Sequence, residues 1–134
     1  MSADVWPVRV YYEDTDAGGI VYHASYLRFA ERARTEFLRA GGFDQSRLAV
    51  EHGIVFAVTR CTIEFVRPAR LDDLLQVATR PVTVGGVRFE LEQLVTHGET
   101  VVARLRVTLA TLDAATLRPK RLPEAVRQVF ATND

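Results

Sequence analysis

The sequence has little of what marks several common classes of protein. Among its 134 residues Cys61 is the only cysteine, so the chain can form neither an intrachain disulfide nor a cysteine-rich zinc site. Basic and acidic residues number 17 each, and without a block of like charges no nucleic-acid partner is expected. No stretch reaches the roughly 18 apolar residues of a membrane span. The first residues lack the basic and apolar segments of a signal peptide, so we expect a cytoplasmic protein.

One long helical pattern is present, from about His23 to Ala40. Apolar residues recur there at spacings of three and four, and charged residues mostly fall on the opposite side. The apolar face consists of Leu27, Ala30, Ala33, Phe37 and Leu38. Gly41 and Gly42 are expected to end this helix. Short helices are also predicted over Gln45 to Glu51 and over Pro123 to Phe130.

The rest of the chain has the period of two that is typical of half-buried strands. The predicted strands are Val5 to Glu13, Ile54–Val66, Leu74–Val84, Val87–Thr96 and Thr100–Leu112. Glycine-containing turns join the last three strands into an antiparallel meander. Because one helix face and one sheet face must bury each other, we predict an α+β fold in which a five-stranded antiparallel sheet wraps around one long helix. Residues 1–134 then form a single domain, and its open sheet edges predict pairing between chains.

Two carboxylates, Asp14 and Asp16, lie between the first predicted strand and the long helix. The first N–H groups of a helix have no intrahelical partner and lie at the positive end of its dipole, where they can stabilise an oxyanion. A nearby carboxylate could attack a carbonyl or take a proton from water. This combination suits thioester hydrolysis without a metal. Turn and cap formation explains the same residue types, so both interpretations stand at this point.

Other motifs fit the segment poorly. A calcium loop that began at Asp14 would place Gly18 at its fifth position and Ser25 at its twelfth, where oxygen ligands of acidic or amide residues are needed. No Gly-Lys-Ser or Gly-Lys-Thr follows the glycines, so they do not form a phosphate loop. The three histidines lack metal-ligand spacing. Only His23 lies at the predicted helix start, where it either binds substrate and places the carboxylate or is structural.

The segment Tyr-Glu-Asp-Thr-Asp-Ala-Gly-Gly-Ile-Val-Tyr-His-Ala-Ser-Tyr-Leu closely resembles the signature of the 4-hydroxybenzoyl-CoA thioesterase family of hotdog proteins. Within that family the chain is most similar to the bacterial acyl-CoA thioesterases associated with the Tol-Pal system. The similarity extends through residues 31–36 and 67–73, and it covers about residues 7 to 130. The resemblance implies an acyl-CoA thioester hydrolase of the hotdog fold that needs neither a metal nor another cofactor.

The resemblance also implies which residues form the site. Asp16 is the implied catalytic carboxylate, and His23 is a suspected participant. Backbone N–H groups near Tyr22 and His23 are implied to bind the thioester oxygen, with Gly19 and Val21 beside them. Tyr12 and Tyr26 are candidates for the acyl pocket or for the core. Family members are dimers or tetramers whose active sites lie at subunit interfaces.

Arg88 and Arg60 are the predicted contacts for coenzyme A. Some family members carry a basic cluster before the fourth strand, and here residues 84–88 contain Arg88 alone. This departure leaves open whether the acyl group arrives on free coenzyme A or on an acyl carrier protein. Two alternative functions remain on the sequence alone. One is a hydratase or dehydratase of acyl thioesters, and the other is a scaffold that binds acyl carrier protein or a Tol-Pal division complex.

Overall fold

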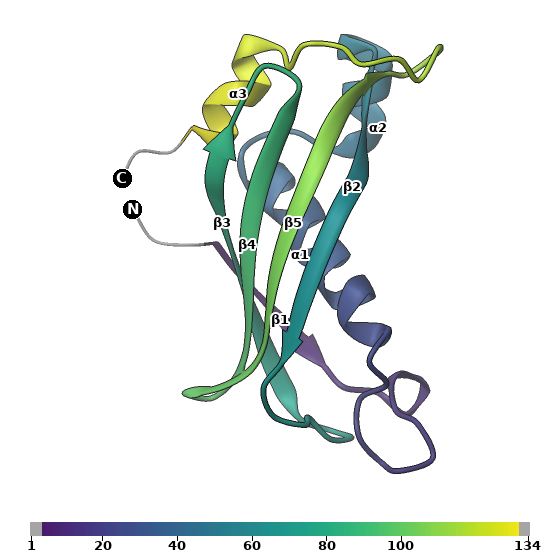
Figure 1. The fold of residues 1–134 in the computed structure, drawn as a ribbon, viewed down its shortest axis with the longest axis vertical. Coiled ribbons are helices and arrows are strands. Elements are labelled where there is room, and N and C mark those ends of the chain that lie inside the picture. Colours follow the sequence, from purple (N-terminus) through teal and green to yellow (C-terminus); the bar gives the residue numbers. More distant parts are fainter. Residues whose placement is uncertain (1–3, 132–134) are drawn as a thin grey trace.

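The structure is a computed structural model that describes residues 4–131. In chain order its elements are β1 (Asp4–Arg9), η1 (Tyr12–Asp14), α1 (Ser25–Ala40), α2 (Gln45–Arg47), η2 (Leu48–His52), β2 (Ile54–Phe65), β3 (Leu74–Val84), β4 (Arg88–His97), β5 (Thr100–Asp113) and α3 (Glu124–Phe130). Figure 1 shows α1 lying along one face of the strands. Within the described part of the chain, no helix has both the length and the hydropathy to cross a membrane.

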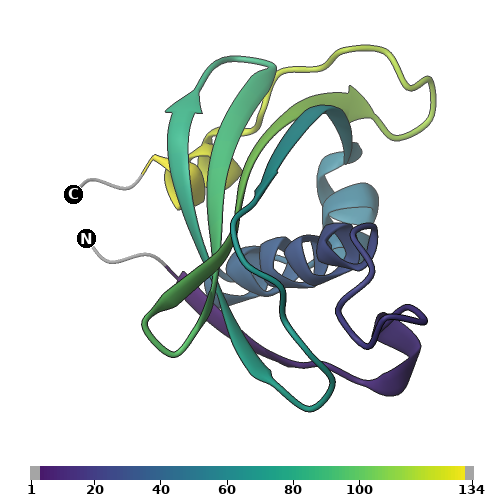
Figure 2. The ribbon, with the colours of Figure 1, turned by 60° about the horizontal axis from the view of Figure 1, so that its bottom comes forward.

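The strands form one antiparallel sheet in the order β1-β3-β4-β5-β2. Figure 2 shows that this sheet curves around α1, with α3 beside one end of the helix. The predicted α+β hotdog architecture, with a five-stranded antiparallel sheet around one long helix, is confirmed. In this order β1 and β2 are the two edges, so one side of each edge strand has no neighbour among the described strands.

The core follows the periodicities of the sequence with one exception. Strand β4 buries Phe89, Leu91 and Val95 because alternate residues of a strand face the same side. Helix α1 buries residues at spacings of three and four, but Leu27 remains 47% exposed. The prediction that Leu27 faces the core is therefore wrong. Tyr26 occupies the inward position of the first turn of α1. It lies on the same buried face of the helix as Phe29, Ala30, Ala33 and Phe37.

Two element boundaries differ from the prediction around the acidic segment. Strand β1 ends at Arg9 and not at Glu13, and Tyr12–Asp14 form a single 3-10 turn. The Asp14 carboxylate accepts a hydrogen bond from the Tyr11 N–H at 2.8 Å, which bends the chain away from the sheet. Helix α1 begins at Ser25, because residues 23–24 form a turn that leads into it.

A buried amide joins the helix to the sheet. Gln93 of β4 is fully buried, and its Nε2 donates to the Ala30 carbonyl and to Thr79 Oγ1, both at 2.9 Å. Its Oε1 accepts a hydrogen bond from Arg34 Nη1 at 3.0 Å. Buried polar atoms require such partners, so the amide fixes one position of α1 against β3 and β4. This contact helps to hold the helix start at a fixed place relative to the sheet.

Candidate active site

Asp14 anchors the loop that precedes α1. Its buried carboxylate accepts hydrogen bonds from the Tyr11 N–H at 2.8 Å and from Arg28 Nη2 at 3.0 Å, the latter also an ion pair. Its backbone carbonyl accepts from the Tyr22 N–H at 2.9 Å and from Ser25 Oγ at 3.1 Å. Asp14 thus joins the start of the loop of residues 15–21 to Tyr22 at its end and to the first turn of α1. Its carboxylate already accepts hydrogen bonds from two donors of the protein.

We expect Asp14→Asn to lower the free energy of unfolding by about 1–3 kcal/mol, since the two donors bond to different carboxylate oxygens and asparagine replaces one of these oxygens by an NH2 group. Urea denaturation measures this loss. Glu13→Gln is the matched control, because Glu13 is exposed and such a surface change is within roughly 0.5 kcal/mol. Equal midpoints for the two variants would show that the Asp14 contacts contribute nothing to stability.

Asp16 is held by its own loop. The Asp16 N–H donates to the Ile20 carbonyl and the Gly19 N–H donates to the Asp16 carbonyl, both at 3.0 Å. The Gly18 N–H donates to Asp16 Oδ1 at 2.8 Å, whereas Oδ2 has no hydrogen-bond partner within residues 4–131. Gly19 has φ +81°, a conformation that favours glycine. The loop therefore orients one carboxylate oxygen and leaves the other free.

A cavity of about 310 Å³ opens beside Asp16. Its walls come from the acidic loop, from the start of α1 and from the segment that follows β2. They are Asp16, Ile20, Val21, His23, Tyr26, Phe65, Val66, Arg67 and Pro68. The exposed imidazole of His23 lies between two rings, with its centroid 4.5 Å from that of Tyr22 and 6.3 Å from that of Phe65. The cavity therefore combines a free carboxylate oxygen with mostly apolar walls.

Most N–H groups around the helix start already have acceptors. The Tyr22 N–H donates to Asp14, the Val21 N–H to Ala69 and the Gly19 N–H to Asp16. These three predicted donors are therefore engaged within the chain. In the part of the chain that the structure describes, the His23 N–H and the Ala24 N–H have no acceptor. Both precede the first residue of α1, where the helix dipole favours negative charge.

Of the two predicted coenzyme A contacts, neither Arg88 nor Arg60 lines the Asp16 cavity. Arg88 begins β4, at the end of the strand away from the Asp16 loop. His97 ends the strand, and it lies 3.7 Å from Asp73, which is beside that loop. The length of β4 separates these ends by about 30 Å at roughly 3.3 Å per residue. Arg60 lies about 17 Å before Phe65 on β2 by the same measure.

The basic side chain that the structure brings to the cavity is Arg67, which the sequence interpretation did not select. Its position follows from the turn after β2, where its N–H donates to the Val102 carbonyl at 3.2 Å. Of the two tyrosines considered for the acyl pocket, Tyr26 lines the cavity, and Tyr12 is 82% exposed and does not. An arginine directly after an apolar strand is too common a pattern to have identified Arg67 as a residue of the cavity.

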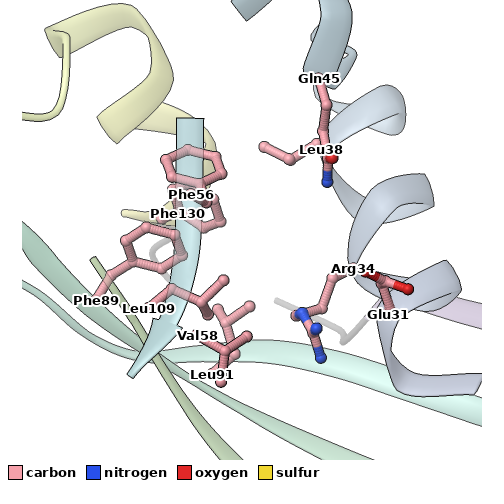
Figure 3. Close-up of a pocket in the computed structure, with 10 residues that line it drawn as sticks. All are labelled: Glu31, Arg34, Leu38, Gln45, Phe56, Val58, Phe89, Leu91, Leu109 and Phe130. Atoms are coloured by element: carbon pink, nitrogen blue, oxygen red, sulfur yellow. The ribbon is translucent and has the colours of Figure 1, made fainter. Parts of the chain in front are cut away.

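Further cavities follow the seam between α1 and β2. One of about 90 Å³ is shown in Figure 3, where Phe56, Phe89 and Phe130 face Arg34 and Leu38 across it. A second, of about 320 Å³, is lined by Cys61 and shares Glu31, Arg34 and Val58 with the first. Burial lowers the pKa of Arg34, and the Glu31 charge acts against this shift. The seam therefore has apolar side chains on its walls, with the guanidinium groups of Arg28 and Arg34 and the carboxylate of Glu31 beside them.

Cys61 lies only partly inside the core. It is half-buried and packs against the core from β2. Burial raises the pKa of its thiol, and the Arg34 charge acts in the opposite direction. A raised thiol pKa favours the unreactive protonated form. Nor do His, Cys, Asp or Glu side chains gather in groups of three that could hold a metal ion anywhere within residues 4–131.

The described chain combines a curved sheet around one helix with a cavity that Asp16 lines at the start of that helix. A family model described as "Thioesterase-like superfamily" matches residues 10–130. The chain belongs to this superfamily, as the sequence predicted. The family membership and the class of enzyme, a thioester hydrolase, are confirmed.

Individual relatives agree with this assignment. The chain is 44% identical over 126 residues to a protein of Escherichia coli O157:H7 named acyl-CoA thioester hydrolase YbgC, and the match covers 93% of each chain. It is 30% identical over 124 residues to 1,4-dihydroxy-2-naphthoyl-CoA hydrolase of Nostoc punctiforme, covering 92% of this chain and 84% of the relative. A crystal structure of a probable thioesterase from Bartonella henselae superposes with a TM-score of 0.87 at 42% identity, covering 91% of this chain and all of the other.

Proposed function

We propose that this chain hydrolyses acyl-CoA thioesters to a free acid and coenzyme A in the Asp16 cavity. The observation that carries the proposal is that Asp16, one of whose carboxylate oxygens has no hydrogen-bond partner within residues 4–131, lines the same cavity as His23 at the start of α1. The names of the relatives support an acyl-CoA substrate. No contact in the cavity specifically favours a hydratase or a scaffold, so those two alternatives are set aside.

In the proposed reaction Asp16 takes a proton from a water molecule, and the resulting hydroxide attacks the thioester carbon. Negative charge moves onto the carbonyl oxygen, where the free His23 N–H donates a hydrogen bond to it. The tetrahedral intermediate then collapses as the carbon–sulfur bond breaks. Coenzyme A leaves as a thiolate that receives the proton from Asp16. Atoms and charge balance in these steps, and the carboxylate is regenerated.

The carboxylate could instead attack the thioester itself and form a mixed anhydride. A single turnover in ¹⁸O-labelled water separates the two routes. With Asp16 as a general base, the label enters the product acid directly. With Asp16 as a nucleophile, water that opens the anhydride at the Asp16 carbonyl labels the enzyme and delivers an unlabelled oxygen to the product.

The proposal is tested by release of thiol from a panel of short, long and aromatic acyl-CoAs. At least one of them should be hydrolysed with ordinary Michaelis–Menten behaviour, and its acyl carrier protein ester is assayed beside it. A preference for the coenzyme A ester fits the proposal. Hydration of an enoyl-CoA without release of thiol would identify the hydratase instead.

We also propose that two copies pair along β2. This strand is an edge of 12 residues, and an unpaired edge is a template for another strand. Antiparallel pairing about a two-fold axis near the middle of β2 places the Phe65 end of one copy beside the Phe56 end of the other. The Asp16 cavity of one copy then approaches the seam of its partner, which offers apolar walls for an acyl group.

Thr59→Pro tests this pairing. The β2–β5 register skips Thr59 at a bulge, and proline is tolerated at bulges and on edge strands. We expect the variant to keep its circular dichroism spectrum while the dissociation constant of the dimer rises about tenfold or more, the equivalent of roughly 1.4 kcal/mol. Analytical ultracentrifugation measures this change, and Thr62→Val is the control. A dimer unaffected by Thr59→Pro would place the interface elsewhere.

A further inference from the structure

We propose that the hydroxyl of Tyr26 is a second hydrogen-bond donor to the thioester oxygen, beside the His23 N–H. This inference rests on the proposed function of the Asp16 cavity. Tyr26 lies in the first turn of α1, is only 3% exposed, and lines the cavity together with Asp16 and His23. A buried polar group at the wall of a cavity usually meets either a protein partner or a ligand.

The ring of Tyr26 has a fixed position. Its centroid lies 5.9 Å from that of Phe29 in an edge-on arrangement, and 5.7 Å from that of Phe65. Phe29 is part of the core, whereas Phe65 is itself a wall of the Asp16 cavity. Aromatic contacts on two sides restrict the side-chain rotamer, so the hydroxyl is placed before any substrate binds. Such preorganisation is what an oxyanion donor requires.

The hydroxyl proton of Tyr26 has no acceptor within residues 4–131. Burial raises the pKa of the Tyr26 phenol. A hydrogen bond from the backbone of Ala69 to the phenol oxygen acts against this shift, and the Asp73 charge adds to it. Tyr26 therefore keeps its proton at neutral pH and can donate a hydrogen bond, but it does not serve as the base.

The geometry of a helix brings this donor toward the oxyanion position. Side chains of an α-helix lean toward its N-terminus, so Tyr26 covers the turn that contains His23. The two groups are three residues apart and thus lie on the same side of the helix start. Of the atoms of a thioester, the carbonyl oxygen gains negative charge during attack, whereas a neutral sulfur is a weak acceptor. The hydroxyl is therefore assigned to the oxygen.

Tyr26→Phe removes this donor and keeps the ring. We expect kcat for the best acyl-CoA substrate to fall by about 10²–10³-fold, the effect of losing one oxyanion donor, while KM changes little. Tyr11→Phe is the control, because its ring is 63% exposed and lies outside the cavity. A thermal unfolding curve of each variant separates a loss of activity from a loss of fold. Wild-type kcat in folded Tyr26→Phe would overturn the inference.

A spectroscopic measurement detects the hydrogen bond itself. The probe is a ¹³C-labelled ketone analogue of the best substrate, in which a CH₂ group replaces the sulfur so that no hydrolysis occurs. The carbonyl stretch of the bound analogue should lie at a lower wavenumber in the wild-type protein than in Tyr26→Phe. If Tyr26→Phe fails to fold, 3-fluorotyrosine at position 26 is used instead. Its more acidic hydroxyl should lower the wavenumber further.

The outcomes separate this inference from the proposed function. If the wild-type protein releases no thiol from any acyl-CoA, the proposed function fails and the inference fails with it. If the wild-type protein hydrolyses its substrate and the carbonyl stretch is the same with tyrosine, phenylalanine or fluorotyrosine at position 26, only the role of Tyr26 is refuted. A shift confined to the position 26 variants, with no shift in Tyr11→Phe, supports the assignment.

Discussion

Asp16→Asn is expected to lower kcat for acyl-CoA hydrolysis by about 10²–10⁴-fold, the usual contribution of a general base. Asparagine preserves the size of the side chain, and its amide oxygen can still accept the Gly18 N–H that now bonds to Oδ1 at 2.8 Å. The loop should therefore keep its shape. What is lost is the negative charge and the second oxygen, which has no hydrogen-bond partner within residues 4–131 and is the atom proposed to take the proton from water. Steady-state thiol release with the purified variant measures the effect.

Two controls make the Asp16 result specific. Glu13→Gln removes a nearby exposed carboxylate and should leave kcat unchanged. The thermal midpoint of Asp16→Asn should match that of the wild-type protein, because the side chain is exposed and makes its one hydrogen bond within its own loop. Wild-type turnover by folded Asp16→Asn would refute the mechanism, and the free carboxylate oxygen would then need another explanation.

Phe89→Ala is expected to lower the free energy of unfolding by about 3–5 kcal/mol, the usual cost of removing a fully packed phenylalanine. The Phe89 ring centroid lies 4.2 Å from that of Phe130 in a stacked pair, and 5.1 Å from that of Phe56 in an edge-on pair. The side chain joins α3 to the sheet and forms one wall of the cavity in Figure 3. Its removal enlarges a cavity that the surrounding rings cannot fully close.

Chemical denaturation at equilibrium measures the Phe89 effect, and Phe65→Ala is the matched control. Phe65 is 53% exposed, so truncating its ring removes far less buried area and should change stability much less. The comparison isolates packing, because both variants make the same chemical change on a strand. Similar losses for both variants would mean that the aromatic cluster is less tightly packed than the distances indicate.

Much of the fold could be predicted from the sequence because α1 and strands β3, β4 and β5 each bury residues at a regular spacing. The predicted bounds of β3 hold, and α1 and β2 differ from prediction by one or two residues. Leu27 was misplaced because Tyr26 competes with it for the inward position of the same turn. Gln93 follows the inward phase of β4 but is polar, so alternation alone could not reveal that its amide bonds to the helix.

The site was harder to predict, since its contacts join residues distant along the chain. The sequence presents Asp14 and Asp16 as two similar acids, and only the contact with Arg28, in the first turn of α1, shows that the first of them is a buried anchor. Local spacing also could not show that the Tyr22 N–H is engaged by Asp14. Position along a strand also could not show that Arg88 lies at the end of β4 away from the Asp16 cavity, so its contact with coenzyme A stays a prediction. The resemblance identified the segment that contains Asp14, Asp16 and Tyr22, and the structure shows which of these residues line the cavity and which are engaged in hydrogen bonds within the chain.

The loop of residues 16–20, which carries Asp16, has an evolutionary consequence. Its bonds are local, linking Asp16 to Gly18, Gly19 and Ile20, while the aromatic cluster lies toward the other end of α1. Mutations can therefore exchange core side chains, and so change the space available to an acyl group, without altering the hydrogen bonds that position the Asp16 carboxylate. Substrate range and thermal tolerance can drift in such a protein while the chemistry of bond cleavage is inherited intact.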